Sequence, residues 1–285
     1  MPASIQRGFT LTEAMVVIVI TGIIVAVVAV FIPAPVKGYF DTTRRAQLSD
    51  LADTAVRRVT RDLRLALPNS IRVTSSGGVS YLEFLLTRSG GRYRAERDSG
   101  GGGDVLEFGS AANPFRFDVI GPAPALVANA DQVVVYNLGP GFAGADAYET
   151  AGNNRRTVTA VSGSTVTLSP AVAFPFESPA KRFQVVETVV TYACAPDAGN
   201  PAAGVLRRYA GYAIQQAQPD TPAELAAGSS AVLAGNVAAC AFTYDPNAVN
   251  LRNGVVAFAL TLTQPTPGGS ESVNLLQQVH VSNVP

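Results

Sequence analysis

The chain has 285 residues, with 21 basic and 21 acidic side chains, so its formal net charge at pH 7 is zero. Only 15% of the residues are charged, and this balance gives no electrostatic reason to expect a nucleic acid or an acidic substrate as a partner. The length allows one or two domains, and 26 glycines and 19 prolines among short Val-, Thr-, Phe- and Tyr-rich runs predict a β-rich domain with many loops.

The first predicted element is an apolar segment near the N-terminus. No charged residue occurs between Glu13 and Lys37, and residues 14–32 are almost entirely apolar. About 20 such residues suffice to cross a bilayer as a helix. Val and Ile are modest helix formers in water, but in lipid only a helix lets a lone segment satisfy its own backbone hydrogen bonds. We therefore predict one transmembrane helix over residues 9–32.

The residues in front of this segment differ from a secretory signal. A signal peptidase needs a small-residue site after the apolar core, whereas here Gly8 precedes the core, behind a short polar head that contains Arg7. Glu13 stands at the start of the apolar run, where a charge inside the bilayer is costly. Two interpretations of Glu13 are open from chemistry alone: an interfacial acid favoured by the helix dipole, or a carboxylate that needs a partner.

The stretch Gly8-Phe9-Thr10-Leu11-Thr12-Glu13 resembles the class III leader of the type IV pilin-like family. The resemblance implies that a prepilin peptidase cleaves after Gly8 and methylates the new amine of Phe9. It also implies that Glu13 compensates the N-terminal amine of a neighbouring subunit in a filament. Residues 1–8 are then a leader and take no part in the fold.

A second helix is expected after a break. Pro33 and Pro35 predict a kink or an interruption, because proline removes a helix hydrogen bond and clashes with the preceding turn. From residue 39 to residue 67, apolar residues recur at spacings of three and four and predict an amphipathic helix that rests on a globular domain. The apolar stripe consists of Leu48, Ala52, Ala55, Val56, Val59, Leu63 and Leu67.

The opposite side of this helix carries Asp50, Arg57, Arg61 and Arg64, and Arg58 adds a fourth arginine to this cluster. Such a cluster can bind DNA, but no aromatic residues for base stacking accompany it. We favour a solvated helix face on which the arginines alternate with Asp53 and Asp62, and we expect no nucleic-acid partner.

The remainder predicts an antiparallel β-rich domain, so the fold class is α+β, with a leader at 1–8, a long helix at 9–67 and an extracytoplasmic domain at 68–285. Residues 157–168 form the clearest hairpin, which turns at residues 162–164. Long loops are expected at 121–130, 139–154 and 217–236. Strands are expected at 81–86, 105–108, 115–120, 132–138, 157–161, 165–168, 182–193, 205–209, 237–244, 255–263 and 273–281.

The chain has two cysteines, Cys194 and Cys240. Beyond a membrane span, such a pair favours a disulfide in an oxidising compartment, and two buried free thiols in a cytosolic domain are the alternative.

The sequence contains conflicting signals for the orientation of the chain in the membrane. The basic residues after the span, Lys37, Arg44 and Arg45, would by the positive-inside rule place the C-terminal side in the cytoplasm. The leader motif and the cysteine pair indicate the opposite. We expect a single-pass protein of the bacterial inner membrane with a periplasmic domain.

Catalytic and metal chemistry find little support in the sequence. Residues 99–104, Ser-Gly-Gly-Gly-Gly-Asp, lack the following helix and lysine of a phosphate loop and predict a hairpin tip. His280 is the single histidine, and no Gly-x-Ser-x-Gly elbow occurs. One histidine and two distant cysteines do not make a zinc site. We expect no enzymatic activity, no metal and no cofactor.

Blocks beyond the leader are similar to MSHA-type minor pilins, encoded with MSHA biogenesis proteins, and to J-type minor pseudopilins of type II secretion. The resemblance implies a structural subunit that initiates or caps a type IV pilus or a pseudopilus. Its implied partners are the prepilin peptidase, other minor pilins or pseudopilins, the major subunit, the inner-membrane assembly platform and membrane lipid. The alternative is a membrane-anchored binding or adhesin module. The blocks are residues 41–48, 57–64, 66–70, 190–194, 207–214, 240–245 and 278–285.

Overall fold

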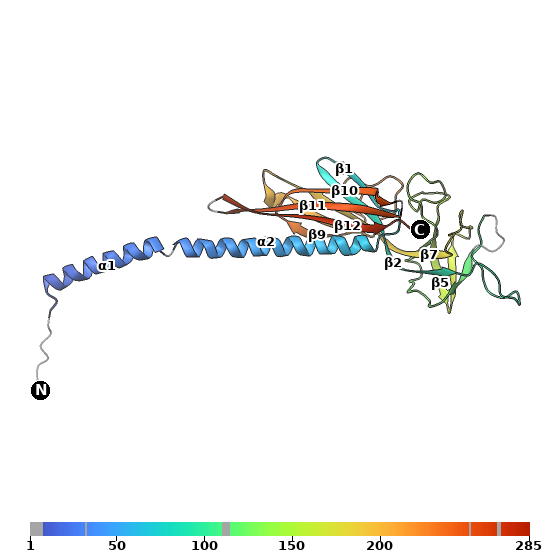
Figure 1. Ribbon diagram of the computed structural model, residues 1–285, viewed down its shortest axis with the longest axis horizontal. Helices are drawn as coiled ribbons and strands as arrows, with labels where there is room; N and C mark the ends of the chain where they lie inside the picture. Colours follow the sequence, from blue (N-terminus) through green and yellow to red (C-terminus); the bar gives the residue numbers. More distant parts are fainter. Residues whose placement is uncertain (1–7, 32, 110–114, 251, 267–268) are drawn as a thin grey trace, which may run out of the picture. The chain divides into compact units, whose positions relative to one another are not determined.

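The computed structural model describes residues 8–31, 33–109, 115–250, 252–266 and 269–285. The chain divides into two compact units, residues 1–49 and residues 50–285. The order of elements is two helices followed by twelve β-strands, with one short 3-10 helix at Pro201–Ala203 (Figure 1). This arrangement confirms the predicted α+β class with an antiparallel β-rich domain.

The first helix, α1, runs from Leu11 to Phe31, and none of its 21 residues is buried. It is the one helix among the described residues that is long and apolar enough to cross a membrane. α1 ends at Phe31 and the next helix begins at Pro33, and residue 32, directly before the predicted break at Pro33 and Pro35, lies outside the described residues.

The second helix, α2, runs from Pro33 to Arg64, so the prediction of residues 39–67 was wrong at both ends. A proline is accepted in a first helical turn because its missing N–H would have no partner there. At the other end, the N–H groups of Leu65 and Ala66 bond to Asp62 and Leu63, which tightens the last turn, and Ala66 then pairs with Leu86 of a strand.

The C-terminal part of α2 is amphipathic, as predicted. Ala52, Ala55, Val59 and Leu63 are buried, while the side chain of Arg57 points to solvent and pairs with Asp53 at 2.6 Å. The spacing of three and four places these apolar residues on one face, and burying that face stabilises the helix on the domain.

Nine strands form the larger sheet, in the order β1-β2-β3-β6-β5-β4-β7-β8-β9, and every pairing is antiparallel. The long strands β2 and β7 also pair with each other, with Leu82 opposite Tyr192. The bounds are β1 Arg72–Ser76, β2 Val79–Tyr93, β3 Arg116–Ile120, β4 Gln132–Val134, β5 Arg155–Ser162, β6 Thr165–Ser169, β7 Arg182–Ala195, β8 Val205–Ala210 and β9 Ser229–Gly235.

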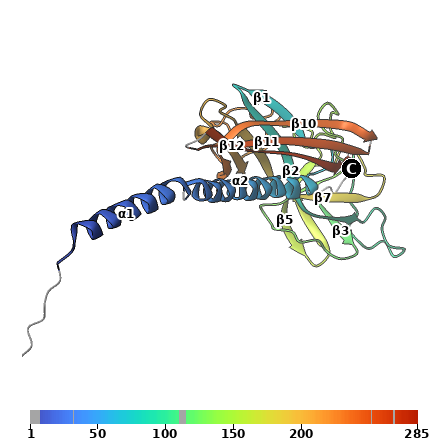
Figure 2. The same ribbon diagram turned by 60° about the vertical axis from the view of Figure 1, so that its left-hand side comes forward.

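Three further strands form the second sheet, β10 Val237–Asn250, β11 Asn253–Thr266 and β12 Gly269–Ser282. They are antiparallel neighbours and lie side by side in both views (Figures 1 and 2). On the buried face of this sheet Phe242 and Phe258 stack with ring centroids 4.7 Å apart.

Strand predictions were right where apolar residues recur in long runs and wrong where backbone geometry or single contacts decide. The predicted strand 132–138 ends at Val134, because Tyr136 has a φ of 52°, which no ladder residue adopts. Residues 105–108 are not a strand: Leu106 bonds to Arg94, and Phe108 forms an isolated bridge to Phe174. These contacts go to different neighbours and build no ladder.

Two strands were missed. β1 had no prediction, and β9 lies within the tract 217–236, which was predicted to be a loop. The hairpin at 157–168 is confirmed as β5 and β6, and Gly163 takes a φ of 61° in its turn.

Candidate processing and assembly site

Gly8, Phe9 and Thr10 precede α1 without regular structure, and the side chain of Phe9 is 86% exposed. A Cβ atom added at Gly8 would meet no atom within 4 Å, so packing within this chain does not require a glycine there. The predicted cleavage bond between Gly8 and Phe9 therefore lies in an exposed segment without regular secondary structure. Arg7 and the rest of the predicted leader lie outside the described residues.

Glu13 is held by the residue that caps its own helix. The backbone N–H of Thr10 donates to Oε2 of Glu13 at 3.0 Å, the Thr10 hydroxyl donates to the same oxygen at 3.0 Å, and the N–H of Glu13 donates back to the Thr10 hydroxyl at 3.3 Å. This reciprocal pattern is a capping box, which satisfies N–H groups that a helix start leaves without partners. Its signature, Thr-x-x-Glu, stands in the sequence at residues 10–13 and is the local signal that predicts this cap.

The cysteines form a disulfide between Cys194 of β7 and Cys240 of β10, with Cα atoms 6.3 Å apart. Ser80 of β2 also accepts a hydrogen bond from the N–H of Phe242 of β10 at 3.3 Å, so a covalent bond and a polar contact both join the large sheet to the three-stranded sheet. Of the two alternatives, the structure supports the disulfide.

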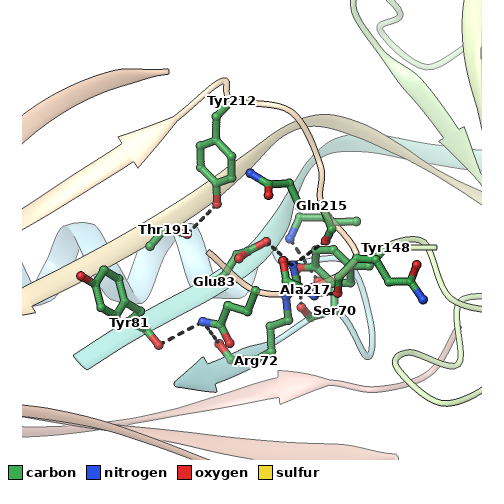
Figure 3. Close-up of polar contacts among 12 residues, drawn as sticks. Ser70, Arg72, Tyr81, Glu83, Tyr148, Thr191, Tyr212, Gln215 and Ala217 are labelled. Carbon is green, nitrogen blue, oxygen red and sulfur yellow. Dashed lines mark hydrogen bonds and ion pairs between the residues drawn. The ribbon is translucent and has the colours of Figure 1, made fainter. Parts of the chain in front are cut away.

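A buried ion pair lies inside the domain, where Arg72 of β1 donates to Glu83 of β2 at 2.9 Å (Figure 3). The guanidinium also lies 3.6 Å from the ring centroid of Tyr148 and donates to the carbonyl oxygens of Gln215 and Gln216. Arg72 thus fastens the loop between β8 and β9 to the first hairpin of the sheet.

The carboxylate of this pair is poorly satisfied. Glu83 is fully buried, and its Oε2 has no hydrogen-bond partner within the described part of the chain. Burial raises the pKa of Glu83 to about 7, although the nearby Arg72 opposes the rise. The neighbouring Tyr212 shares a 2.6 Å hydrogen bond with Thr191, and burial raises the pKa of that phenol as well. These groups face one another in the interior and serve to hold the loop.

A second buried carboxylate joins the helix to the sheet. Asp62 of α2 accepts from the hydroxyl of Tyr192 and from Nε of Arg208, both at 2.8 Å. The interpretation of Asp62 as part of a solvated helix face was wrong, because its side chain is buried against β7 and β8. Tyr192 and Arg208 lie 130 and 146 residues from Asp62, so no local pattern points to them, whereas Arg58, at 3.3 Å, is a neighbour on the same helix.

The other residues singled out by sequence lie apart. His280 is exposed in β12, opposite Val255 of β11. Residues 99–104 lie in the connection between β2 and β3, where Asp98 and Gly102 close a turn with a 2.9 Å backbone hydrogen bond. Within the described residues, no three His, Cys, Asp or Glu side chains gather as a metal site would require.

Comparison with known proteins adds one match. Residues 4–29 match the family model described as the prokaryotic N-terminal methylation motif. No significant match was found among curated proteins or among solved structures. The matched stretch covers the predicted cleavage bond, Glu13 and most of the apolar helix α1. The motif, followed directly by a helix able to span a membrane, supports a precursor of the type IV pilin-like family.

Proposed function

We propose that this protein is a minor pilin or pseudopilin, which a prepilin peptidase cleaves between Gly8 and Phe9 and which then enters a type IV pilus or a type II secretion pseudopilus. The observation that carries the proposal is the methylation motif at residues 4–29, with Glu13 in the first turn of a membrane-capable helix. Its role is structural, and we assign it no enzymatic reaction.

The helix explains why such a subunit assembles. Every described side chain of α1 is exposed in the single chain, so the helix needs lipid or other apolar helices around it. Packing against sibling helices replaces lipid contacts with helix contacts, as in other membrane assemblies. A carboxylate taken into such a bundle needs an opposite charge, and the amine of a cleaved Phe9 on a neighbouring subunit can supply it.

The domain is proposed to be periplasmic, with a single pass through the bacterial inner membrane. The disulfide favours an oxidising compartment, and this argument outweighs the basic residues that follow the span. Similarity of the blocks beyond the leader to MSHA-type and J-type subunits supports a low-copy subunit that initiates or caps the filament.

Processing is tested by co-expressing the full chain with a prepilin peptidase and measuring the intact mass and N-terminal sequence. We expect a mature chain that begins with methylated Phe9, and a Gly8→Ala variant that keeps its leader. Because Gly8 makes no close contacts, a processing defect in this variant does not reflect a folding defect. A wild-type chain that still begins at Met1 would refute the proposal and would favour a membrane-anchored binding module, which needs no cleavage.

Assembly is tested by two substitutions at Glu13, one that retains the helix cap and one that removes it. Glu13→Gln keeps a side chain that can cap the helix but removes the charge, whereas Glu13→Ala removes both. We expect both variants to stay in the membrane and both to be depleted from the sheared filament fraction. Normal incorporation of Glu13→Gln would show that the cap, and not the charge, is what assembly requires.

A further inference from the structure

A groove of about 580 Å³ lies between the C-terminal part of α2 and β12, and all the residues that line it belong to the compact unit of residues 50–285. Arg57, Arg61 and Arg64 line it from the helix, and Gln277 lines it from the strand. Helix and strand run side by side in both views (Figures 1 and 2). Neither the residues of the processing motif nor the Arg72–Glu83 pair line the groove.

The groove carries a net positive charge. Its three arginines face one aspartate, Asp53, which leaves a net charge of +2. Asp53 forms an ion pair with Arg57, at 2.6 Å. The carboxylate closest to Arg61 is that of Asp62, at 3.9 Å, and Arg58, Tyr192 and Arg208 already occupy it. Arg64 has no ion pair within the described residues. Two cations therefore remain available for an anionic partner.

The other wall of the groove belongs to an edge strand. β12 pairs with β11 along all 14 of its residues, and in the described chain no strand pairs with its opposite edge. Proteins usually protect long edges with lysine, proline, a bulge or a covering helix, and here the groove separates α2 from β12 at Gln277. From Ser272 to Ser282 the strand has no lysine, arginine or proline, and its register with β11 runs without a bulge. Such an edge can accept the backbone of an added strand.

The spacing of the arginines along the helix is close to the side-chain spacing of an extended chain. In a strand, every second side chain points the same way, about 6.6 Å apart. Along a helix, residues separated by three or four positions are about 4.5 to 6 Å apart in rise. Acidic residues at alternate positions of an added strand would therefore meet successive arginines of α2.

We propose that this groove binds an extended acidic segment of a partner protein, which pairs its backbone with β12 and its carboxylates with Arg61 and Arg64. The inference does not rest on cleavage at Gly8, because no atom of the processing motif lines the groove.

The test uses the full-length protein in a neutral detergent and a fluorescein-labelled peptide of alternating glutamate and threonine. Fluorescence anisotropy at low ionic strength measures its affinity, and an alternating glutamine and threonine peptide is the uncharged control. The double variant Arg61→Gln/Arg64→Gln is expected to weaken binding about tenfold, in line with two partly exposed charge pairs. Arg97→Gln is the matched control, because Arg97 is similarly exposed but lies in the connection after β2.

Gln277 tests the contribution of the strand wall. Gln277→Glu is expected to weaken binding of the acidic peptide and Gln277→Lys to strengthen it, each about threefold, because the new charge lies beside the bound carboxylates. The proposal is overturned if the acidic peptide binds no better than the uncharged one, or if the arginine double variant binds like Arg97→Gln. It is also overturned if a short DNA duplex binds more tightly than the peptide with the same dependence on these residues, since the partner would then be a nucleic acid.

Discussion

Glu83→Gln is the substitution that tests the buried ion pair most directly. The folded protein holds the Glu83 proton up to about pH 7, because burial raises its pKa, whereas the unfolded chain releases it near the ordinary value of 4.5. Between these values the folded state binds more protons, so the free energy of unfolding falls as the pH rises. At 1.36 kcal/mol for each pH unit, the fall comes to about 3 kcal/mol. Glutamine keeps the shape and an oxygen for Arg72 but cannot ionise.

Urea unfolding of the full-length protein in a neutral detergent, followed by near-ultraviolet circular dichroism, measures this difference. The comparison of interest is wild type against Glu83→Gln at about pH 4.5 and about pH 8. Other titrating groups are common to both proteins, so the difference between the two curves isolates Glu83. We expect wild type to lose about 3 kcal/mol relative to the variant over this range.

Glu187→Gln serves as the control, because Glu187 pairs with Arg88 at 3.2 Å on the surface and its side chain is 43% exposed. Its effect is expected to be below about 1 kcal/mol and to change little with pH. The reasoning would be wrong if the stability difference between wild type and Glu83→Gln stayed constant from acid to neutral pH, since Glu83 would then be ionised in the folded protein throughout.

Three further substitutions probe the links that hold the domain together. Replacing both Cys194 and Cys240 by alanine should lower the free energy of unfolding by about 4 kcal/mol, because the disulfide closes a loop with a sequence separation of 46; urea titration of the oxidised wild type and the variant measures this. Asp62→Asn should cost about 3 kcal/mol by leaving Arg208 without its carboxylate, and an unchanged unfolding midpoint would contradict that role. Arg72→Leu should release the loop between β8 and β9, which faster hydrogen exchange at residues 214–218 would report and unaltered protection would refute.

Short-range patterns in the sequence predicted short-range structure. The spacing of Ala52, Ala55, Val59 and Leu63 predicted the buried face of α2, and the structure confirms it. The apolar run predicted α1 by its length, because about 20 apolar residues suffice to cross a bilayer as a helix.

Polar pairs between residues far apart in the sequence could not be predicted from short-range patterns. Asp62 looks like one more charge on an exposed helix face until β7 and β8 bring Tyr192 and Arg208 to it. Arg72 and Glu83 are different: they stand directly opposite each other in the β1–β2 register, so recognising β1 would have predicted the pair. The Arg72–Glu83 pair was therefore not predicted, because strand β1 was not predicted.

Glu13 shows how a local signal and a long-range one can meet in one side chain. In the uncleaved chain its carboxylate is bonded to the N–H and the hydroxyl of Thr10. Under the proposed processing, the new ammonium of Phe9 stands one residue before Thr10 in the chain. A pairing with a neighbouring subunit must then replace bonds that Glu13 already makes within its own chain. A hydrogen bond to a charged group is worth about 1.5–3 kcal/mol net, whereas opposite charges attract far more strongly once apolar helices exclude water. The exchange is therefore favourable only inside a packed bundle, and this condition would keep single subunits in the membrane from pairing prematurely.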